Sequence, residues 1–519
     1  MELQAKYRHS RWHHALGGQV RIRTIAILSA VFWTVTATAK EPTDAEWAEA
    51  FEPYDIAMAR GNATQAADAL VELIQGEGKE AFRPEALHNL GDLLLELDLP
   101  YGALSAYAEA LSAGDKAPIP AVNKAIKVAE SLGDLAILEP IFGQNVGLEV
   151  SGEARASMAW LAARQNFRDG NLGTTLGILA LIQKDSKHFV DAQHLKGVVN
   201  SIQGRYTDAL APLMTAAAMA EDPETLDLIH LNLARAYYGA ANYPRAIEYF
   251  AKVQRGSPHW LEAQMERAWA HFRLEDVSGS VSLLLTHLAP WFESHYLPEA
   301  HLLQTYSLFL LCKFPTANEE IEAFRSKYLA VNAQLEAALM RSDNTSIFQQ
   351  TAGLRRSERT DVPAQMLVPY LTENRFLKAA NAVEKAEEDL QRLRNVSANP
   401  FSAVVMDWVR ARRDSLIESE GARIKTFLQF QANALGTMLA DTEIARLDIL
   451  RLETKLYEQA ATLGEMEKAK RLAQRKMRVP RGHQRWAFQG EYWADELGYF
   501  RVTAQPVCPS SLIADTERR

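Results

Sequence analysis

Cysteine is nearly absent from this 519-residue sequence, in which Cys312 and Cys508 are the whole complement. Two thiols are too few for a disulfide-scaffolded fold or a cysteine-based zinc module, so the protein has to fold around an apolar core. Glycine and proline are also sparse, with 27 and 20 residues, which argues against a low-complexity or collagen-like chain. We therefore expect a globular protein.

The motifs of common active sites are missing as well. The sequence has no glycine-rich phosphate loop, no Gly-x-Ser-x-Gly elbow, no His-Glu-x-x-His and no cysteine or histidine cluster with metal-ligand spacing. No pair of carboxylates stands out as a general acid and base. We therefore predict a protein that is not an enzyme and needs no cofactor.

Positive charge is scarce too. The formal net charge is −9, and it becomes −13 when the five basic residues and one acid of segment 1–39 are left out. Nucleic acid and anionic lipid both require a clustered basic face on the protein. No such cluster is visible, so neither is predicted to be the main partner.

Segment 1–39 has the pattern of an export signal. Arg21 and Arg23 precede the apolar run TIAILSAVFWTVTATA, whose end at positions 37–39 is a small-x-small cleavage pattern. At about 15 residues the run is shorter than the roughly 20 that a membrane-spanning helix needs, although a retained anchor is the alternative. We therefore predict a signal peptide over 1–39, no integral membrane span after its cleavage, and a periplasmic or envelope-associated location.

Beyond Lys40 the sequence repeats with a period of roughly 34 to 38 residues. The clearest unit is DLIHLNLARAYYGAANYPRAIEYFAKVQRGSP, residues 227–258, and a second is PEALHNLGDLLLELDLPYGALSAYAEAL, residues 84–111. Both resemble the tetratricopeptide repeat, because small and large apolar residues occupy that motif's positions on two successive helices. Small residues such as Gly91 and Ala103 let helices approach closely, and Tyr107 fills the wedge between repeats.

The same frame fits eight times along the chain. Units begin near Trp47, Pro84, Pro118, Ala156, Val190, Asp227, Leu261 and Pro298. We therefore predict an all-α fold, a tetratricopeptide-like α-solenoid of about eight helix pairs over residues 40–331, in which stacking buries the apolar face of each unit. The resemblance implies a right-handed superhelix whose concave wall is lined by the first helix of each pair.

The resemblance also implies where a protein partner binds. Asn89 and Asn232 stand at the sixth place of a first helix, like the residue that grips a peptide backbone in peptide-binding members of the family. The alternative is that such side chains only solvate a helix or cap a loop. The residues predicted to be exposed on the concave wall and to bind a partner are His88, Asn89, Asp92, Asn232, Arg235, Tyr238, Trp269 and Tyr306.

The pattern changes after residue 331. The polar stretch LRRSERTDVPAQMLVP predicts a connecting segment over 332–374. Heptad-type seams then run from Phe376 to Leu393 and from Leu435 to Met466, which predicts a helical hairpin or coiled-coil-like region over 375–478. Packing within the chain is favoured over a dimeric rod. The charge run RARRDS, residues 410–415, is interpreted as a solvated helix face.

The last stretch, 479–519, is predicted to be an aromatic tail without helical periodicity. Six aromatic residues lie between Trp486 and Phe500, and we expect them to be buried in a short hairpin or an ordered wrap. The core GEYWADELG with a terminal cysteine resembles the ends of exported repeat proteins of gliding, predatory bacteria of the myxobacterial type. That resemblance implies cell-envelope machinery such as a motility or secretion complex.

The two cysteines offer a way to fasten this tail. A bridge between Cys312 and Cys508 would close a loop of roughly 200 residues and make the tail a lid on the last repeats. The alternatives are a buried core thiol at Cys312 and an aromatic tail that forms a groove for a partner or a glycan.

The sequence as a whole predicts a non-catalytic scaffold or adaptor that binds another protein in the bacterial cell envelope. A glycan-processing envelope enzyme is the alternative, in which Glu491 and Asp495 would form an acid pair beside Trp493. A chaperone-like subunit for outer-membrane protein assembly shares the scaffold's features, because one fold class hosts many functions.

Overall fold

The computed structural model describes residues 42–144, 150, 152–396, 398–463 and 492–507. Within these residues the chain is helical and has no β-strand, so the all-α fold class is confirmed. The described chain divides into two compact units. The N-terminal unit comprises residues 42–199 and 373–422, and the C-terminal unit comprises 200–372 and 423–507. The predicted signal peptide over 1–39 lies outside the described residues.

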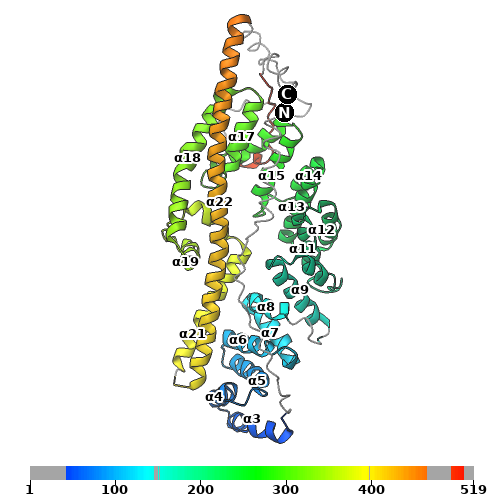
Figure 1. Ribbon diagram of the computed structural model, residues 1–519, viewed down its shortest axis with the longest axis vertical. Helices are drawn as coiled ribbons and strands as arrows, with labels where there is room; N and C mark the ends of the chain where they lie inside the picture. Colours follow the sequence, from blue (N-terminus) through cyan, green and yellow to red (C-terminus); the bar gives the residue numbers. More distant parts are fainter. Residues whose placement is uncertain (1–41, 145–149, 151, 397, 464–491, 508–519) are drawn as a thin grey trace, which may run out of the picture. The chain divides into compact units, whose positions relative to one another are not determined.

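The repeats appear as eight successive helix pairs in the described part of the chain, and each pair starts within four residues of its predicted position (Figure 1). The pairs are α3 (Asp44–Ala59) and α4 (Ala63–Gln75), α5 (Arg83–Glu96) and α6 (Pro100–Leu111), α7 (Ile119–Leu132) and α8 (Glu139–Gln144), α9 (Gly152–Arg168) and α10 (Leu172–Leu179), α11 (Phe189–Ile202) and α12 (Tyr206–Met219), α13 (Pro223–Gly239) and α14 (Tyr243–Phe250), α15 (Trp260–Arg273) and α16 (Val277–His287), and α17 (Pro298–Leu310) and α18 (Phe314–Arg341). The short 3-10 turns η1 (Gly114–Lys116) and η3 (Pro290–Phe292) lie between pairs, and η2 (Leu135–Ile137) lies inside the third pair.

Glycine facing tyrosine permits close packing both inside a pair and between successive pairs. A Cβ atom added to Gly91 of α5 would lie 2.4 Å from the ring of Tyr107 on α6, well inside van der Waals contact. Tyr107 is fully buried, and its hydroxyl donates to Asp92 at 2.6 Å. Gly239 of α13 is placed in the same way against Tyr206 of α12. The predicted role of the small residues is therefore confirmed at Gly91.

Each pair also turns at one residue with a left-handed backbone. Four of these residues are glycine, for which a positive φ carries no steric cost, and four are not. They are Gly61, Asp98, Gly133, Gly170, Gly204, Ala241, Glu275 and Cys312. The turn geometry therefore repeats eight times even where the sequence does not show a glycine.

The region predicted to connect, 332–374, is mostly helical in the C-terminal unit. Helix α18 continues to Arg341, and α19 (Asn344–Leu354), α20 (Ala364–Leu367) and η4 (Val368–Leu371) follow. Leu335, Ala338, Ile347 and Phe348 are buried. Ser342 is buried, but Gln334, Glu336 and Arg341 are exposed. The exposed polar residues are why the stretch resembles a linker in the sequence.

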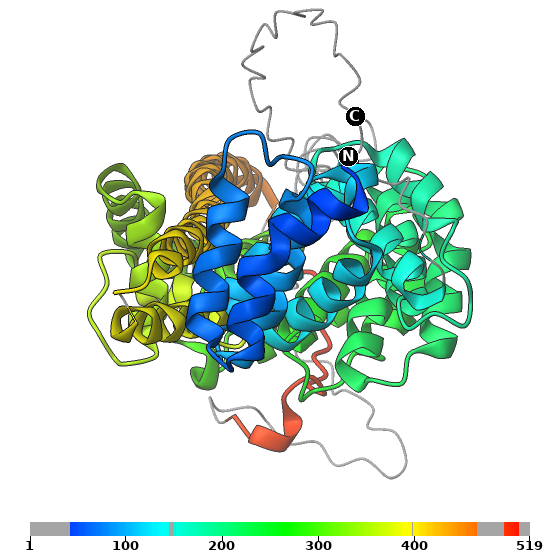
Figure 2. The ribbon, with the colours of Figure 1, turned by 90° about the horizontal axis from the view of Figure 1, so that it is seen from below.

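The predicted helical hairpin is present in the N-terminal unit. It consists of α21 (Asn374–Asn395) and the first part of α22 (Pro400–Leu463). The ion pairs Arg375–Glu420 and Arg413–Glu387 show that the two helices run antiparallel. Figure 2 shows α21, in yellow, beside the blue helices of the first repeats, and α21 contacts α6 and α7.

The second seam behaves differently, because it packs on the last repeat of the C-terminal unit. Leu435, Met438 and Ile449 of α22 share a core with Phe324 and Tyr328 of α18. The contacts lie within the chain, as expected, but they join a long helix to a repeat and do not form a second hairpin arm. The seam beyond residue 463 lies outside the described residues.

The described tail, residues 492–507, is neither helix nor hairpin. One 3-10 turn, η5 (Ala494–Glu496), precedes an extended segment of the C-terminal unit. Tyr492 and Phe500 are partly buried against each other, but Trp493 and Tyr499 are 56% and 76% exposed. The expectation that all the tail aromatics are buried is therefore wrong for these two, because only one side of the segment packs. Trp486 and Phe488 lie outside the described residues.

Candidate functional site

In the N-terminal unit, the predicted binding residues of α5 form part of a polar cluster. Asp92 accepts hydrogen bonds from the Lys124 ammonium at 2.6 and 2.7 Å and from Tyr107. His88 lies beside them, with its Nε2 atom 3.4 Å from the Lys124 Nζ atom. Burial lowers the pKa of His88, so its imidazole is neutral at pH 7. Asn89, on the same helix, is half-buried.

This cluster joins the first helices of two successive pairs, because Asp92 lies on α5 and Lys124 on α7. The side chains of Asp92 and Lys124 are 38% and 40% exposed. Solvent therefore reaches a carboxylate and an ammonium that are already held in place by each other.

An ion-pair cluster of the same kind occurs in the C-terminal unit. The Arg235 guanidinium on α13 donates to both carboxylate oxygens of Glu266 at 3.0 Å and to Glu262 at 2.5 Å, both on α15. Burial raises the pKa of Glu266 to about 7, against the opposing effect of Arg235. Burial by itself would lower the pKa of Arg235, but the two glutamates raise it overall.

The two clusters occupy equivalent places in the repeat. Arg235 lies eight residues after the unit start at Asp227, as Asp92 does after Pro84. Each therefore projects from the same position of a first helix and pairs with the first helix of the next repeat. The partners Lys124, Glu262 and Glu266 were missed in the sequence analysis. Aligning the units and looking for opposite charge one repeat later could have found them.

The remaining predicted residues lie deeper than expected. Asn232 is half-buried and donates to the Leu228 carbonyl at 3.1 Å, and Trp269 is half-buried among apolar side chains. Tyr238 and Tyr306 are buried, as is His88. The expectation of exposure is wrong for these three, because a first helix packed between neighbouring helices leaves only a narrow stripe to solvent. Partner binding by any of the eight stays a prediction.

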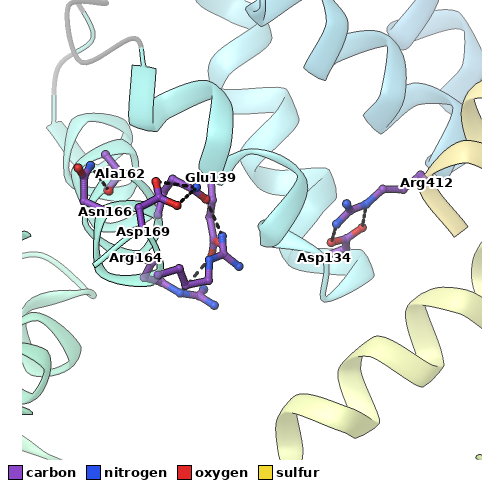
Figure 3. Close-up of polar contacts among 9 residues, drawn as sticks. Asp134, Glu139, Ala162, Arg164, Asn166, Asp169 and Arg412 are labelled. Carbon is purple, nitrogen blue, oxygen red and sulfur yellow. Dashed lines mark hydrogen bonds and ion pairs between the residues drawn. The ribbon is translucent and has the colours of Figure 1, made fainter. Parts of the chain in front are cut away.

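Buried ion pairs outside these clusters have a structural role (Figure 3). Arg412 of α22 binds Asp134 with two nitrogens, one of them at 2.8 Å, and Asp134 is 2% exposed. Buried Glu139 pairs with Arg164, at 3.1 Å, and with Arg168. The interpretation of RARRDS as a solvated face is therefore wrong for Arg412. Its partner lies 278 residues away in the sequence, beyond any local pattern.

Three other features bear on the sequence predictions: metal sites, membrane spans and the acid pair. Among the residues that the structure describes, no group of three or more His, Cys, Asp or Glu side chains is placed to hold a metal ion. In the same residues, no helix has both the length and the hydropathy of a membrane span. Asp495 lies exposed on η5, while Glu491 is outside the described residues, so the acid pair stays a prediction.

Cys312 is partly buried and packs against the core of the C-terminal unit. Next to it, the Val507 amide donates to the Leu311 carbonyl at 3.0 Å. The described tail therefore ends beside Cys312. Cys508 lies outside the described residues, and its pairing with Cys312 stays a prediction.

Solved structures of helical-repeat proteins are similar to parts of this chain. A tetratricopeptide repeat protein from Parabacteroides merdae has 14% identity and a TM-score of 0.27, over 54% of this chain and 92% of that one. A chain of the APC/C hetero-tetramer Cut9–Hcn1 has 11% identity and a TM-score of 0.18, over 77% of this chain and 96% of that one. No family model and no curated protein matches the sequence. The assignment of the fold rests on the helix pairs described above.

Proposed function

We propose that this chain is a non-catalytic scaffold that binds another protein through the exposed stripes of its first helices. The observation that supports this function is the pair of equivalent charge clusters, Asp92–Lys124 and Arg235–Glu262–Glu266. Each links the first helices of neighbouring repeats and leaves part of its charge open to solvent. The Glu262 side chain, for example, is 54% exposed.

Such clusters favour binding because their side chains are ordered before a partner arrives. A long charged side chain that is already held loses little further conformational entropy on association. A cluster that presents both signs of charge also selects a partner with a complementary pattern, and it disfavours one with a single sign. A folded protein surface or a polypeptide segment of mixed charge has that chemistry.

We place this scaffold in the bacterial cell envelope, as part of a motility or secretion complex. The support is the export-signal pattern over 1–39 and the resemblance of the tail to exported repeat proteins. Cleavage after Ala39 predicts a mature protein that begins at Lys40. Amino-terminal sequencing of the protein from a periplasmic fraction tests this, and recovery of the uncleaved chain from the cytoplasm would contradict it.

The binding surface is tested by a crosslinking pull-down from cells that express a tagged chain. One variant changes first-helix residues that are not buried: Asn89→Ala, Lys124→Gln, Asn232→Ala and Glu262→Gln. The matched control changes exposed residues of second helices: Glu109→Gln, Arg245→Gln and Glu248→Gln. Circular dichroism confirms that both variants keep the helical content of the wild type.

We expect the first-helix variant to lose at least one crosslinked protein that the second-helix control retains. Identical partner sets for the wild type and both variants would refute the proposed surface. Loss of the same partner from both variants would also refute it, because the effect would not be specific to first helices.

A further inference from the structure

The tail lies along α16, the second helix of the seventh pair, and is held there through its own backbone. Ser278, Ser282 and Thr286 are spaced four residues apart, so their hydroxyls line one face of α16. These hydroxyls accept hydrogen bonds from the backbone amides of Ala504 at 3.0 Å, Val502 at 2.7 Å and Gly498 at 2.7 Å, respectively. The tail therefore runs antiparallel to α16.

Two further contacts extend this arrangement. The Ser278 hydroxyl is 3.3 Å from the Ala504 carbonyl as well, and the Val507 amide binds the Leu311 carbonyl at the end of α17. Four amides of the tail are thus bound by the repeats: Gly498 lies in the turn 497–499, and the other three lie in the extended segment after it. Backbone groups are common to every residue except proline, which has no N–H, so these contacts recognise an extended polypeptide and not a particular set of side chains.

Side-chain recognition is concentrated at one dipeptide, Leu497-Gly498. Leu497 is 5% exposed and packs in a core with Trp260 and Ala289. Gly498 has a φ of +87°, and a Cβ atom there would lie 2.9 Å from the Trp260 ring. A leucine fills the apolar site, and glycine alone fits next to it. The Arg255 guanidinium adds a contact to the Ala494 carbonyl, just before this dipeptide.

We propose that this face of α16 is a peptide-binding site that the tail fills as a built-in ligand. Its partner is an extended segment of another protein that carries Leu-Gly, with free amides at the positions of Val502 and Ala504. The proposal extends the scaffold function to a second surface and rests on that function for its biological role. The tail keeps the site closed until such a segment displaces it.

The covalent connection of the tail makes this closure strong but reversible. A ligand on the same chain binds intramolecularly, so a free segment competes at a disadvantage. A substitution in the tail that weakens its binding to the site removes that disadvantage and leaves the residues of α16 unchanged. Gly498→Val does this, because valine at a positive φ is strained and meets Trp260.

The experiment uses the full-length chain and a fluorescent peptide with the sequence of residues 492–507, measured by fluorescence anisotropy under reducing conditions. We expect the Gly498→Val chain to bind this peptide at least tenfold more tightly than the wild type does. Adding Ser282→Ala and Thr286→Val to that chain should weaken binding about tenfold, because two amides lose their acceptors.

Altered peptides separate backbone recognition from side-chain recognition. A peptide with Val502→Pro lacks one bound amide and should bind about tenfold more weakly, whereas Tyr499→Ser changes an exposed side chain and should bind as the parent does. Absence of peptide binding by a Gly498→Val chain with wild-type helical content would overturn the proposal. Binding that is insensitive to both Ser282→Ala with Thr286→Val and Val502→Pro would also overturn it.

The outcome is independent of the first-helix pull-down. Peptide binding is measured with purified components, so it can succeed when the first-helix variants lose no partner. Conversely, a partner lost from the first-helix variant says nothing about α16. Failure of one proposal is therefore distinguishable from failure of the other.

Discussion

Removing Arg412 should leave a buried carboxylate without its counter-ion. Arg412→Met keeps much of the side chain's apolar volume and takes away the guanidinium that binds Asp134. Asp134 is 2% exposed, and its side chain also accepts a hydrogen bond from the Tyr101 hydroxyl at 3.5 Å. Among the described residues, Asp134 has no second cation that could replace the lost charge.

The expected cost follows from that burial. Removing one partner of a buried ion pair typically destabilises a protein by about 3 to 5 kcal/mol. The matched control is Arg410→Met, in the same charge run, whose side chain is 46% exposed and pairs with Asp407 at 3.2 Å. An exposed pair of this kind contributes roughly 0 to 1 kcal/mol. The two substitutions should therefore differ by several kcal/mol.

The assay has to follow one part of the chain, because a protein of two units need not unfold in one step. Hydrogen exchange read by mass spectrometry on peptides from α7 and η2 reports the opening of the region around Asp134. The double variant Asp134→Leu with Arg412→Met should recover most of the loss, since no charge remains buried. Equal effects of Arg412→Met and Arg410→Met would refute the reasoning.

Two further predictions concern packing and pH. Gly91→Ala should destabilise the second pair by about 1 to 3 kcal/mol in thermal unfolding, because the new methyl group meets the Tyr107 ring. Gly436→Ala is the control, because it has open space around it and should stabilise α22 by up to about 1 kcal/mol. Equal shifts for the two variants would contradict the proposed packing. Burial lowers the pKa of His188 to about 4, so the stability it contributes is present above its ordinary pKa of about 6.5 and is lost as the pH falls through 4. The wild type should therefore lose roughly 1 to 3 kcal/mol relative to His188→Gln between pH 7.5 and 4 in denaturant titrations, and parallel pH profiles would contradict this.

The helix pairs could be predicted because the residues that specify a pair lie within one repeat unit. Gly91, Ala103 and Tyr107 act within one unit, and the unit recurs often enough to fix the register along the chain. Left-handed turns at Ala241 and Glu275 were not visible, because neither residue signals a positive φ. The tertiary arrangement imposes that backbone at the same place in every pair.

The candidate site was only partly predictable, because its contacts join distant residues. Asp92 and Arg235 were chosen from their helix position, but their partners one repeat later and the depth of Tyr238 depend on how neighbouring helices pack. The hydroxyls of α16 were missed for a related reason. Serine and threonine on every fourth position are ordinary on a helix until a distant segment of the same chain lies across them.

The charge clusters on first helices also restrict how such a chain can grow. In one, an acid (Asp92) is followed by a base (Lys124) on the next first helix, and in the other the base (Arg235) comes before the acids. A recombination that joined the second pair directly to the seventh would set Asp92 against Glu262 and Glu266. Repeats that share one fold are therefore not fully interchangeable, because a rearrangement of the array can place like charges on neighbouring first helices until one of them is reversed.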